Sequence, residues 1–199
     1  EDGTKVAVKV QYPGVREAIG HDLANLGAIF GLVGIAAPGF DPGPFVDELR
    51  RGVFDELDYR RERANQERIG AIFRGHPFIR VPRVFPELST GRILVQELIE
   101  GRPLREARHL PQEERDRIAE ILFRFTFGTM HRHGFFQADP HAGNYLLQPD
   151  GGVAFLDFGC IRVMSDKMVA GMKRVLRASG SKPLSASAAS WNLPSRSVK

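Results

Sequence analysis

Three side chains with oxygen donors lie close together in the second half of the sequence, at Asp139, Asn144 and Asp157. Asp139 and Asn144 share a short polar loop, and a predicted hairpin returns the chain to that loop at Asp157. Phosphoryl transfer needs a carboxylate that aligns or deprotonates the nucleophile, and further oxygen ligands that hold Mg²⁺ on the phosphates. These three residues can supply all of those groups, so their spacing predicts a site for phosphoryl transfer.

A lysine in the middle of a predicted strand, Lys9, can bring positive charge to this site. It lies in the alternating segment 5–10, which a Tyr-Pro-Gly turn at residues 12–14 ends. A strand lysine can neutralise the α- and β-phosphates of a nucleotide when a helix glutamate holds it in place. Glu56 and Glu62 are both candidates for that glutamate.

The elements that must position these residues follow from hydrophobic spacing and from Pro and Gly breakers. The clearest helix begins at Pro111 and ends near Gly134. Pro149-Asp150-Gly151-Gly152 is a typical hairpin connection. The sequence predicts helices over 15–37, 45–73, 111–134 and 166–178, and strands over 5–10, 81–85, 92–98, 145–148 and 153–156. This succession predicts a mixed helix and sheet fold.

In this order and context, the residues resemble one family, the UbiB-type atypical kinases. These are also called aarF domain-containing (ADCK) kinases, and they support coenzyme Q and other isoprenoid-quinone lipid metabolism. The matching stretches are 6–15, 55–65, 137–144 and 156–159. The first two are specific to the family, whereas the last two are shared with protein kinases and aminoglycoside phosphotransferases. The resemblance implies an α+β, two-lobed protein-kinase-like fold over residues 1–178, with an incomplete N-lobe and an incomplete C-lobe.

The resemblance also assigns roles to single residues. It implies that Lys9 is the phosphate-binding lysine, that Glu62 is its ion-pair partner, and that Asp139 is the catalytic-loop aspartate. Asn144 and Asp157 resemble the magnesium ligands of the family.

Further family features map onto the N-terminal half of the chain. Glu97, Leu98 and Ile99 resemble the start of the hinge that receives adenine, near residues 97–101. Glu56 and Asp58 resemble a Glu-x-Asp motif that engages a Lys-x-Gly-Gln segment lying over the site. Residues 15–44 fit the helical insert of the family.

The sequence also departs from the family pattern. The Lys-x-Gly-Gln segment and an alanine-rich loop that covers the nucleotide are expected before residue 1. Gln137 stands where many members carry a histidine that braces the loop, and we expect Gln137 to do the same. His141 can either bond within its loop or touch phosphate, and bonding within the loop is the preferred interpretation.

Composition excludes several other classes of protein. The 199 residues include 28 basic and 24 acidic side chains, a net charge of +4, and the arginines alternate with acids, which indicates solvated helices and not a nucleic-acid site. The single cysteine, Cys160, excludes an internal disulfide and zinc sites built on cysteine pairs. The apolar stretch 23–37 is too short to span a bilayer. Residues 179–199 hold seven serines and no acid, which predicts a disordered tail.

The expected function is therefore that of an ATP- and Mg²⁺-dependent atypical kinase or ATPase in isoprenoid-quinone metabolism. Its expected partners are ATP, a phenolic or isoprenoid lipid precursor and a membrane surface, and its expected location is the cytoplasm, peripheral to the membrane. Two alternatives remain open: a non-catalytic nucleotide-binding scaffold, and a small-molecule phosphotransferase of the aminoglycoside-kinase type. Release of ADP separates the kinase from the scaffold, and stimulation by an aminoglycoside would favour the phosphotransferase.

Overall fold

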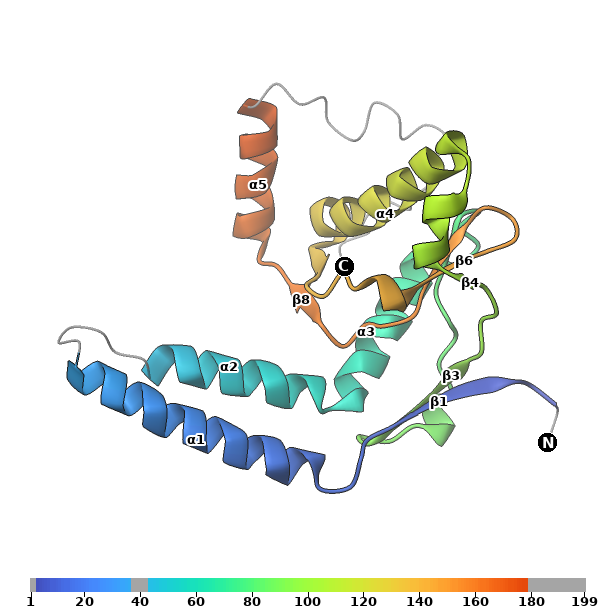
Figure 1. Ribbon diagram of the computed structural model, residues 1–199. Coiled ribbons are helices and arrows are strands. Elements are labelled where there is room, and N and C mark those ends of the chain that lie inside the picture. The colour runs from blue at the N-terminus through green and yellow to red at the C-terminus, as the bar shows by residue number, and fades with distance from the viewer. Residues whose placement is uncertain (1–2, 37–42, 179–199) are drawn as a thin grey trace.

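The computed structural model describes residues 3–36 and 43–178, which form both helices and strands (Figure 1). The helices are α1 (Val15–Ala36), α2 (Gly43–Glu56), α3 (Tyr59–Ile72), α4 (Gln112–His133) and α5 (Asp166–Ala178). The strands are β1 (Val6–Val10), β2 (Ile79–Arg80), β3 (Ile93–Glu97), β4 (Arg102–Pro103), β5 (Phe135–Gln137), β6 (Tyr145–Leu147), β7 (Val153–Phe155) and β8 (Ile161–Val163). Short 3₁₀-helices cover Pro86–Leu88 (η1), Leu104–His109 (η2) and Ala142–Asn144 (η3).

The strands form three small sheets. β1 pairs with β3 in antiparallel register, so that Lys9 lies opposite Leu94. A second sheet has the order β2-β7-β6-β4, and β5 pairs with β8 in a third. The loop after β5 and the loop after β7 therefore leave neighbouring sheets, which brings residues 138–144 close to residues 156–160.

The hydrophobic core lies between α3, α4 and the hairpin of β6 and β7. Phe125 of α4 stacks on Phe155 of β7 with ring centroids 3.7 Å apart, and Phe73 at the end of α3 packs against Phe125 at 5.3 Å. All three side chains are buried. This aromatic cluster fixes α3, which carries Glu62, relative to the hairpin that leads to Asp157.

Helices α1 and α2 form an arm that extends away from this core (Figure 1). They lie side by side, and Phe30 of α1 meets Phe45 of α2 edge to face at 5.7 Å. Helix α1 falls within the predicted insert 15–44. No helix among the described residues is both long and apolar enough to cross a bilayer.

The prediction of one helix over 45–73 was wrong, because the chain breaks between α2 and α3. Asp58 adopts an extended conformation, with φ −110° and ψ 95°, and its side chain accepts a hydrogen bond from the backbone N–H of Arg60 at 3.1 Å. Aspartate is among the best N-cap residues because it satisfies an N–H that has no partner inside the helix. The cap starts a new helix, and α3 leaves α2 at an angle (Figure 1).

The predicted strand 81–85 was also misplaced. Pairing with β7 is confined to β2, and within 81–85 only Val84 makes an isolated bridge, to Gln96. Pro82 has no N–H to give to a sheet ladder, which explains why the strand ends before it. The helix after Pro111, with Gly134 in the left-handed region at φ 68°, and the hairpin 145–156 are confirmed. The predicted tail 179–199 lies outside the described residues.

Candidate active site

Lys9 lies at the centre of the candidate site and joins two carboxylates from distant parts of the chain. Its Nζ atom donates to Oε1 of Glu62 at 2.6 Å and to Oδ2 of Asp157 at 2.9 Å. Lys9 points inward because side chains alternate along β1, where Val6, Val8 and Val10 take the exposed face. Of the two candidate glutamates, Glu62 is thus in contact with the lysine.

Helix α3 positions Glu62 in its first turn, four residues after the Asp58 cap. The Glu62 side chain is almost fully buried, with 4% of its surface exposed. Its Oε1 atom also lies 3.5 Å from the backbone N–H of Phe158. One buried carboxylate therefore contacts both the strand lysine and the segment that carries Asp157.

The segment Asp157-Phe158-Gly159 is held by hydrogen bonds from two elements. Asn65 of α3 donates its amide to the carbonyl of Phe158 at 3.1 Å, and Gln137 of β5 donates to the carbonyl of Asp157 at 3.2 Å. The Phe158 side chain is completely buried in the core. The Asp157 carboxylate accepts the N–H of Gly159 at 3.0 Å and remains partly exposed, so it can still take a ligand.

The loop with Asp139 and Asn144 is shaped by its own histidine. Nδ1 of His141 accepts the N–H of Gly143 at 3.1 Å, which confirms the preferred interpretation that His141 bonds within the loop. The carbonyl of Asn144 accepts the N–H of Leu156 at 3.0 Å, which places Asn144 beside the residue that precedes Asp157. Asp139 lies exposed at the surface of this loop.

Burial and charge shift several pKa values in the site. Burial alone would lower the pKa of the Lys9 ammonium, but the charges and hydrogen bonds of Glu62 and Asp157 outweigh burial and raise it. Burial raises the pKa of the Glu62 carboxyl, with Lys9 acting in the opposite direction. Burial, with a smaller contribution from the negative charge of Asp139, raises the pKa of Tyr145 to about 12. Tyr145 thus stays neutral and donates to Oε1 of Gln137 at 3.3 Å.

The donor set at the loop ends suits Mg²⁺. Asn144 can offer an amide oxygen and Asp157 a carboxylate oxygen, and Mg²⁺ in phosphate sites is typically bound by one or two carboxylates while phosphate and water complete its shell. Within residues 3–36 and 43–178, no three His, Cys, Asp or Glu side chains form a metal-binding group of their own. Asn144 and Asp157 alone would leave coordination positions of Mg²⁺ for phosphate and water.

The three predicted hinge residues, Glu97, Leu98 and Ile99, make different contacts. The carboxylate of Glu97 faces away from Lys9: it pairs with Arg80 at 2.6 Å and accepts the N–H of Arg83 at 3.2 Å. The Leu98 N–H donates to the carbonyl of Lys5 at 3.3 Å, and Ile99 is buried. Glu97 therefore acts through its side chain as a structural residue.

Asp58 caps α3, as described above, and the side chain of Glu56 lies outside what the structure describes. Gln11, which follows β1, donates its side-chain amide to the carbonyl of Leu57 between α2 and α3. Sequence reasoning missed this contact, and it also missed the buried bond from Gln66 to Gln96, 2.7 Å long. Neither contact has a local signal, because each joins residues that meet only after folding.

Comparison with known proteins agrees with this geometry. A family model described as "ABC1 atypical kinase-like domain" matches residues 1–182. An aarF domain-containing protein kinase of Arabidopsis thaliana, named as chloroplastic, is 39% identical over 79% of this chain and 22% of its own length. The atypical kinase COQ8B of Rattus norvegicus, named as mitochondrial, is 36% identical over 89% of this chain and 34% of its own length.

A solved structure from Mycobacterium tuberculosis, Rv3197 in complex with erythromycin, is also similar. It is 35% identical with a TM-score of 0.76, and the match covers 100% of this chain and 51% of Rv3197. The chain thus spans about half of that structure and between about one fifth and one third of the two curated relatives. The family model and the fold shared with Rv3197 show that the chain belongs to the ABC1, or aarF, family of atypical kinases. It contains part of the kinase-like fold of that family.

Proposed function

We propose that this chain forms the nucleotide site of an ATP- and Mg²⁺-dependent atypical kinase or ATPase. The observation that supports this most directly is the double contact of Lys9 with Glu62 and Asp157, at 2.6 and 2.9 Å. It puts one cation and one partly exposed carboxylate side by side, the pair of charges needed to hold phosphate and a divalent metal. Membership of an atypical kinase family supports the same chemistry.

In this proposal each side chain has one task. Lys9, held by Glu62, orients the α- and β-phosphates. Asn144 and Asp157 would hold Mg²⁺, which neutralises charge on the phosphates, and exposed Asp139 aligns the hydroxyl or water that attacks. The backbone of Leu98 and Ile99 lines the adenine side.

The acceptor belongs to the proposal as well. A phenolic or isoprenoid precursor of a quinone lipid, met at a membrane surface, fits the family resemblance of stretches 6–15 and 55–65. Release of ADP that is stimulated by such a compound would support transfer, and release without an acceptor would support hydrolysis. Binding of nucleotide without ADP release would favour the scaffold.

Replacing Asp157 by Asn tests the metal role. We expect the apparent affinity for ATP in the presence of Mg²⁺ to fall at least about tenfold, because the metal loses a carboxylate ligand. Thermal-shift titration of ATP with and without Mg²⁺ measures this. Asp116→Asn, on the exposed face of α4, is the matched control and should behave as wild type. An unchanged Mg²⁺ dependence in Asp157→Asn would contradict the role assigned to this residue.

A further inference from the structure

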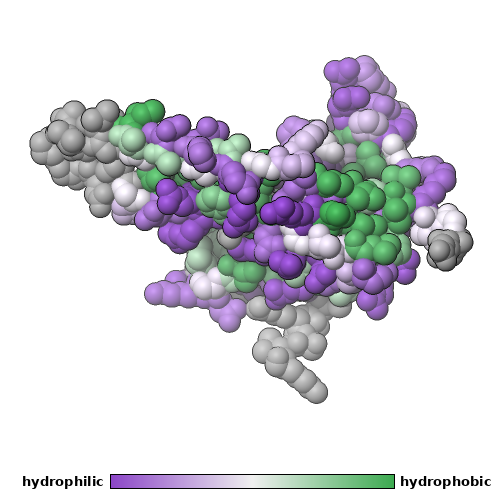
Figure 2. Space-filling view, turned by 90° about the horizontal axis from the view of Figure 1, so that it is seen from below, coloured by the Kyte–Doolittle hydropathy of each residue, from purple (hydrophilic) through white to green (hydrophobic). Residues whose placement is uncertain are grey.

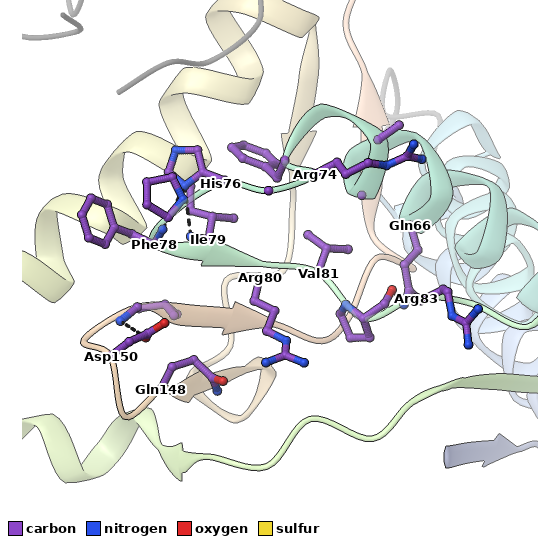
Figure 3. A pocket seen from close by; sticks show the side chains of 18 of the residues that line it. Gln66, Arg74, His76, Phe78, Ile79, Arg80, Val81, Arg83, Gln148 and Asp150 are labelled. Carbon is purple, nitrogen blue, oxygen red and sulfur yellow. Dashed lines mark hydrogen bonds between the residues drawn. The ribbon is translucent and has the colours of Figure 1, made fainter. Parts of the chain in front are cut away.

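A second concave site lies along the C-terminal half of α3 (Figure 3). It is a groove of about 600 Å³. One wall is the C-terminal half of α3, the floor is the segment 74–83, and the other wall is the tip of the hairpin between β6 and β7. Figure 3 shows this segment running between the helix and the hairpin, with Arg80 extending toward Gln148.

The groove contacts both elements that carry the candidate active site without containing its residues. Glu62 lies in the first turn of α3, and Gln66, one turn later, lines the groove. The hairpin starts directly after Asn144 and ends just before Asp157, and its tip forms the opposite wall. A ligand in the groove would therefore brace the helix with Glu62 against the hairpin with both metal ligands.

The charges at the groove favour an anion. Three arginines line it, Arg74, Arg80 and Arg83, against two acids, Glu67 and Asp150. Arg80 is paired with Glu97. For Arg74 and Arg83 the described part of the chain shows no acidic partner, although Arg83 also stacks over Phe85 at 4.4 Å. Each of these guanidinium groups can thus bind a carboxylate or a phosphate, and Figure 3 shows their ends apart from each other.

The inner wall also offers a polar atom without a partner. Gln66 is 1% exposed, and its Nε2 donates to the carbonyl of Pro82 at 2.9 Å and to Gln96 at 2.7 Å. Its Oε1, in contrast, has no donor among the described residues, which is costly for a buried acceptor. Because this oxygen is buried, a ligand can reach it only if the Gln66 amide turns toward the groove, and an N–H or O–H group of the ligand would then satisfy it.

The floor of the groove is already organised. Nδ1 of His76 accepts the N–H groups of Phe78 and Ile79, at 3.2 and 3.1 Å, which fixes the turn that leads into β2. The ring of His76 meets Phe73 edge to face at 5.6 Å. Half-buried apolar side chains such as Val81 line the space between the charges. The apolar surface suits a small hydrocarbon body.

We propose that this groove is an effector site for a small amphipathic organic acid, with an acidic group at one of the arginines on its margin, Arg74 or Arg83, and a hydrogen-bond donor at Gln66. Binding itself does not depend on the proposed nucleotide site. The consequence for that site, a change in affinity for Mg²⁺–ATP, does rest on the proposed function, and it is reciprocal by linkage.

Three related probes test the ligand chemistry on the 199-residue chain without nucleotide. We expect 4-hydroxyphenylacetate, which has both features, to bind saturably in calorimetric or NMR titration. Phenylacetate, without the hydroxyl donor, should bind several-fold more weakly, and 4-hydroxyphenylacetamide, without the charge, about tenfold more weakly. Equal binding of the acid and the amide, or no saturable binding of any probe, would overturn the proposal.

Variants locate the site. Arg74→Ala with Arg83→Ala should weaken 4-hydroxyphenylacetate about tenfold, and Glu67→Gln should strengthen it, since a repelling charge is removed. Arg105→Ala, an equally exposed arginine on η2, is the control and should leave binding unchanged. Circular dichroism of each variant establishes that it is folded.

Asp157→Asn separates the two proposals. If the groove is a distinct site, this variant keeps wild-type affinity for 4-hydroxyphenylacetate even when Mg²⁺–ATP binding is lost. Loss of both together would show that the probe occupies the nucleotide site and would overturn the effector site. In the wild-type chain, probe binding that leaves the affinity for Mg²⁺–ATP unchanged would keep the binding site and refute the coupling.

Discussion

At the scale of single residues, the state of Lys9 decides the electrostatics of the site. Its ammonium is shared by Glu62, whose side chain is 4% exposed, and Asp157, whose side chain is 35% exposed. Removing one partner of a buried ion pair leaves an uncompensated charge and destabilises the fold strongly, even where the intact pair itself adds little. Lys9 therefore stabilises the fold as well as preparing the site, and the two contributions can be separated by pH.

Replacing Lys9 by Met tests this balance. We expect the free energy of unfolding to fall by about 2 kcal/mol near pH 8, because Glu62 remains buried without a cation. The loss should shrink toward about pH 4. Lys9 acts to lower the pKa of Glu62, so its removal raises that pKa further above the ordinary value. The added cost therefore disappears below the ordinary value and appears as the pH rises through the further raised pKa. Urea denaturation across this pH range measures both effects.

The control for this experiment is Lys5→Met. Lys5 pairs with Glu100 at 3.1 Å, but both side chains are largely exposed, so the loss should stay within about 0.5 kcal/mol at every pH. Equal losses in the two variants, or a loss in Lys9→Met that does not change with pH, would contradict the account given for Glu62.

At the scale of elements, the break between α2 and α3 determines where Glu62 lies. A continuous helix over 45–73 would have kept one direction from Phe45 to Phe73. Instead, Asp58 starts α3 afresh, and Gln11 binds the carbonyl of Leu57 at the junction. The cap therefore links a local preference of aspartate to the position of the lysine partner. It also gives Asp58 a structural task besides its resemblance to a family motif.

Replacing Asp58 by Ala should cost about 1 kcal/mol of stability, because α3 loses its N-cap. Asp58→Asn, which keeps a side-chain acceptor, should cost only about 0.3 kcal/mol. Thermal and urea unfolding measure the losses, and Asp22→Ala, on the exposed face of α1, is the control. If Asp58→Asn costs as much stability as Asp58→Ala while Asp22→Ala costs none, the charge of Asp58 stabilises α3 and its capping hydrogen bond does not.

At the scale of the whole molecule, one aromatic cluster joins the helices to the hairpin, while one sheet face remains apolar and open. Val6, Val8 and Val10 are 37%, 52% and 60% exposed on the face of β1 opposite Lys9. Figure 2, which views the molecule from below, shows hydrophobic atoms gathered over β1 and β3. The buried side of the molecule instead depends on Phe73, Phe125 and Phe155.

Phe125→Ala tests that dependence. Truncating a fully buried ring leaves a cavity between α3, α4 and β7, and we expect a loss of about 3–5 kcal/mol in the free energy of unfolding. Phe123→Ala, on the same helix but 48% exposed, should lose less than about 1 kcal/mol. Denaturant unfolding of the pair checks the contrast. Similar losses would mean that α4 contributes to stability through its outer face.

The sequence by itself determined the ends of several elements and the chemistry of the site. Pro111 and Gly134 bound α4 because one suits a helix start and the other takes a left-handed φ of 68° at the helix end. The hairpin around Gly151 followed from its turn residues in the same way. Lys9, Asn144 and Asp157 could be singled out by residue type and order. All of these signals are local, since backbone preference acts between neighbours along the chain.

Only the tertiary structure decided which of these residues meet. It brought Glu62, 53 residues away along the chain, to Lys9 and Asp157, 148 residues away, to the same ammonium. It also buried Gln66 against Gln96 and formed the groove along the C-terminal half of α3. Such contacts depend on how the elements pack, for example on the angle between α2 and α3 and on the stacking of Phe125. Residue type and local periodicity do not encode this packing.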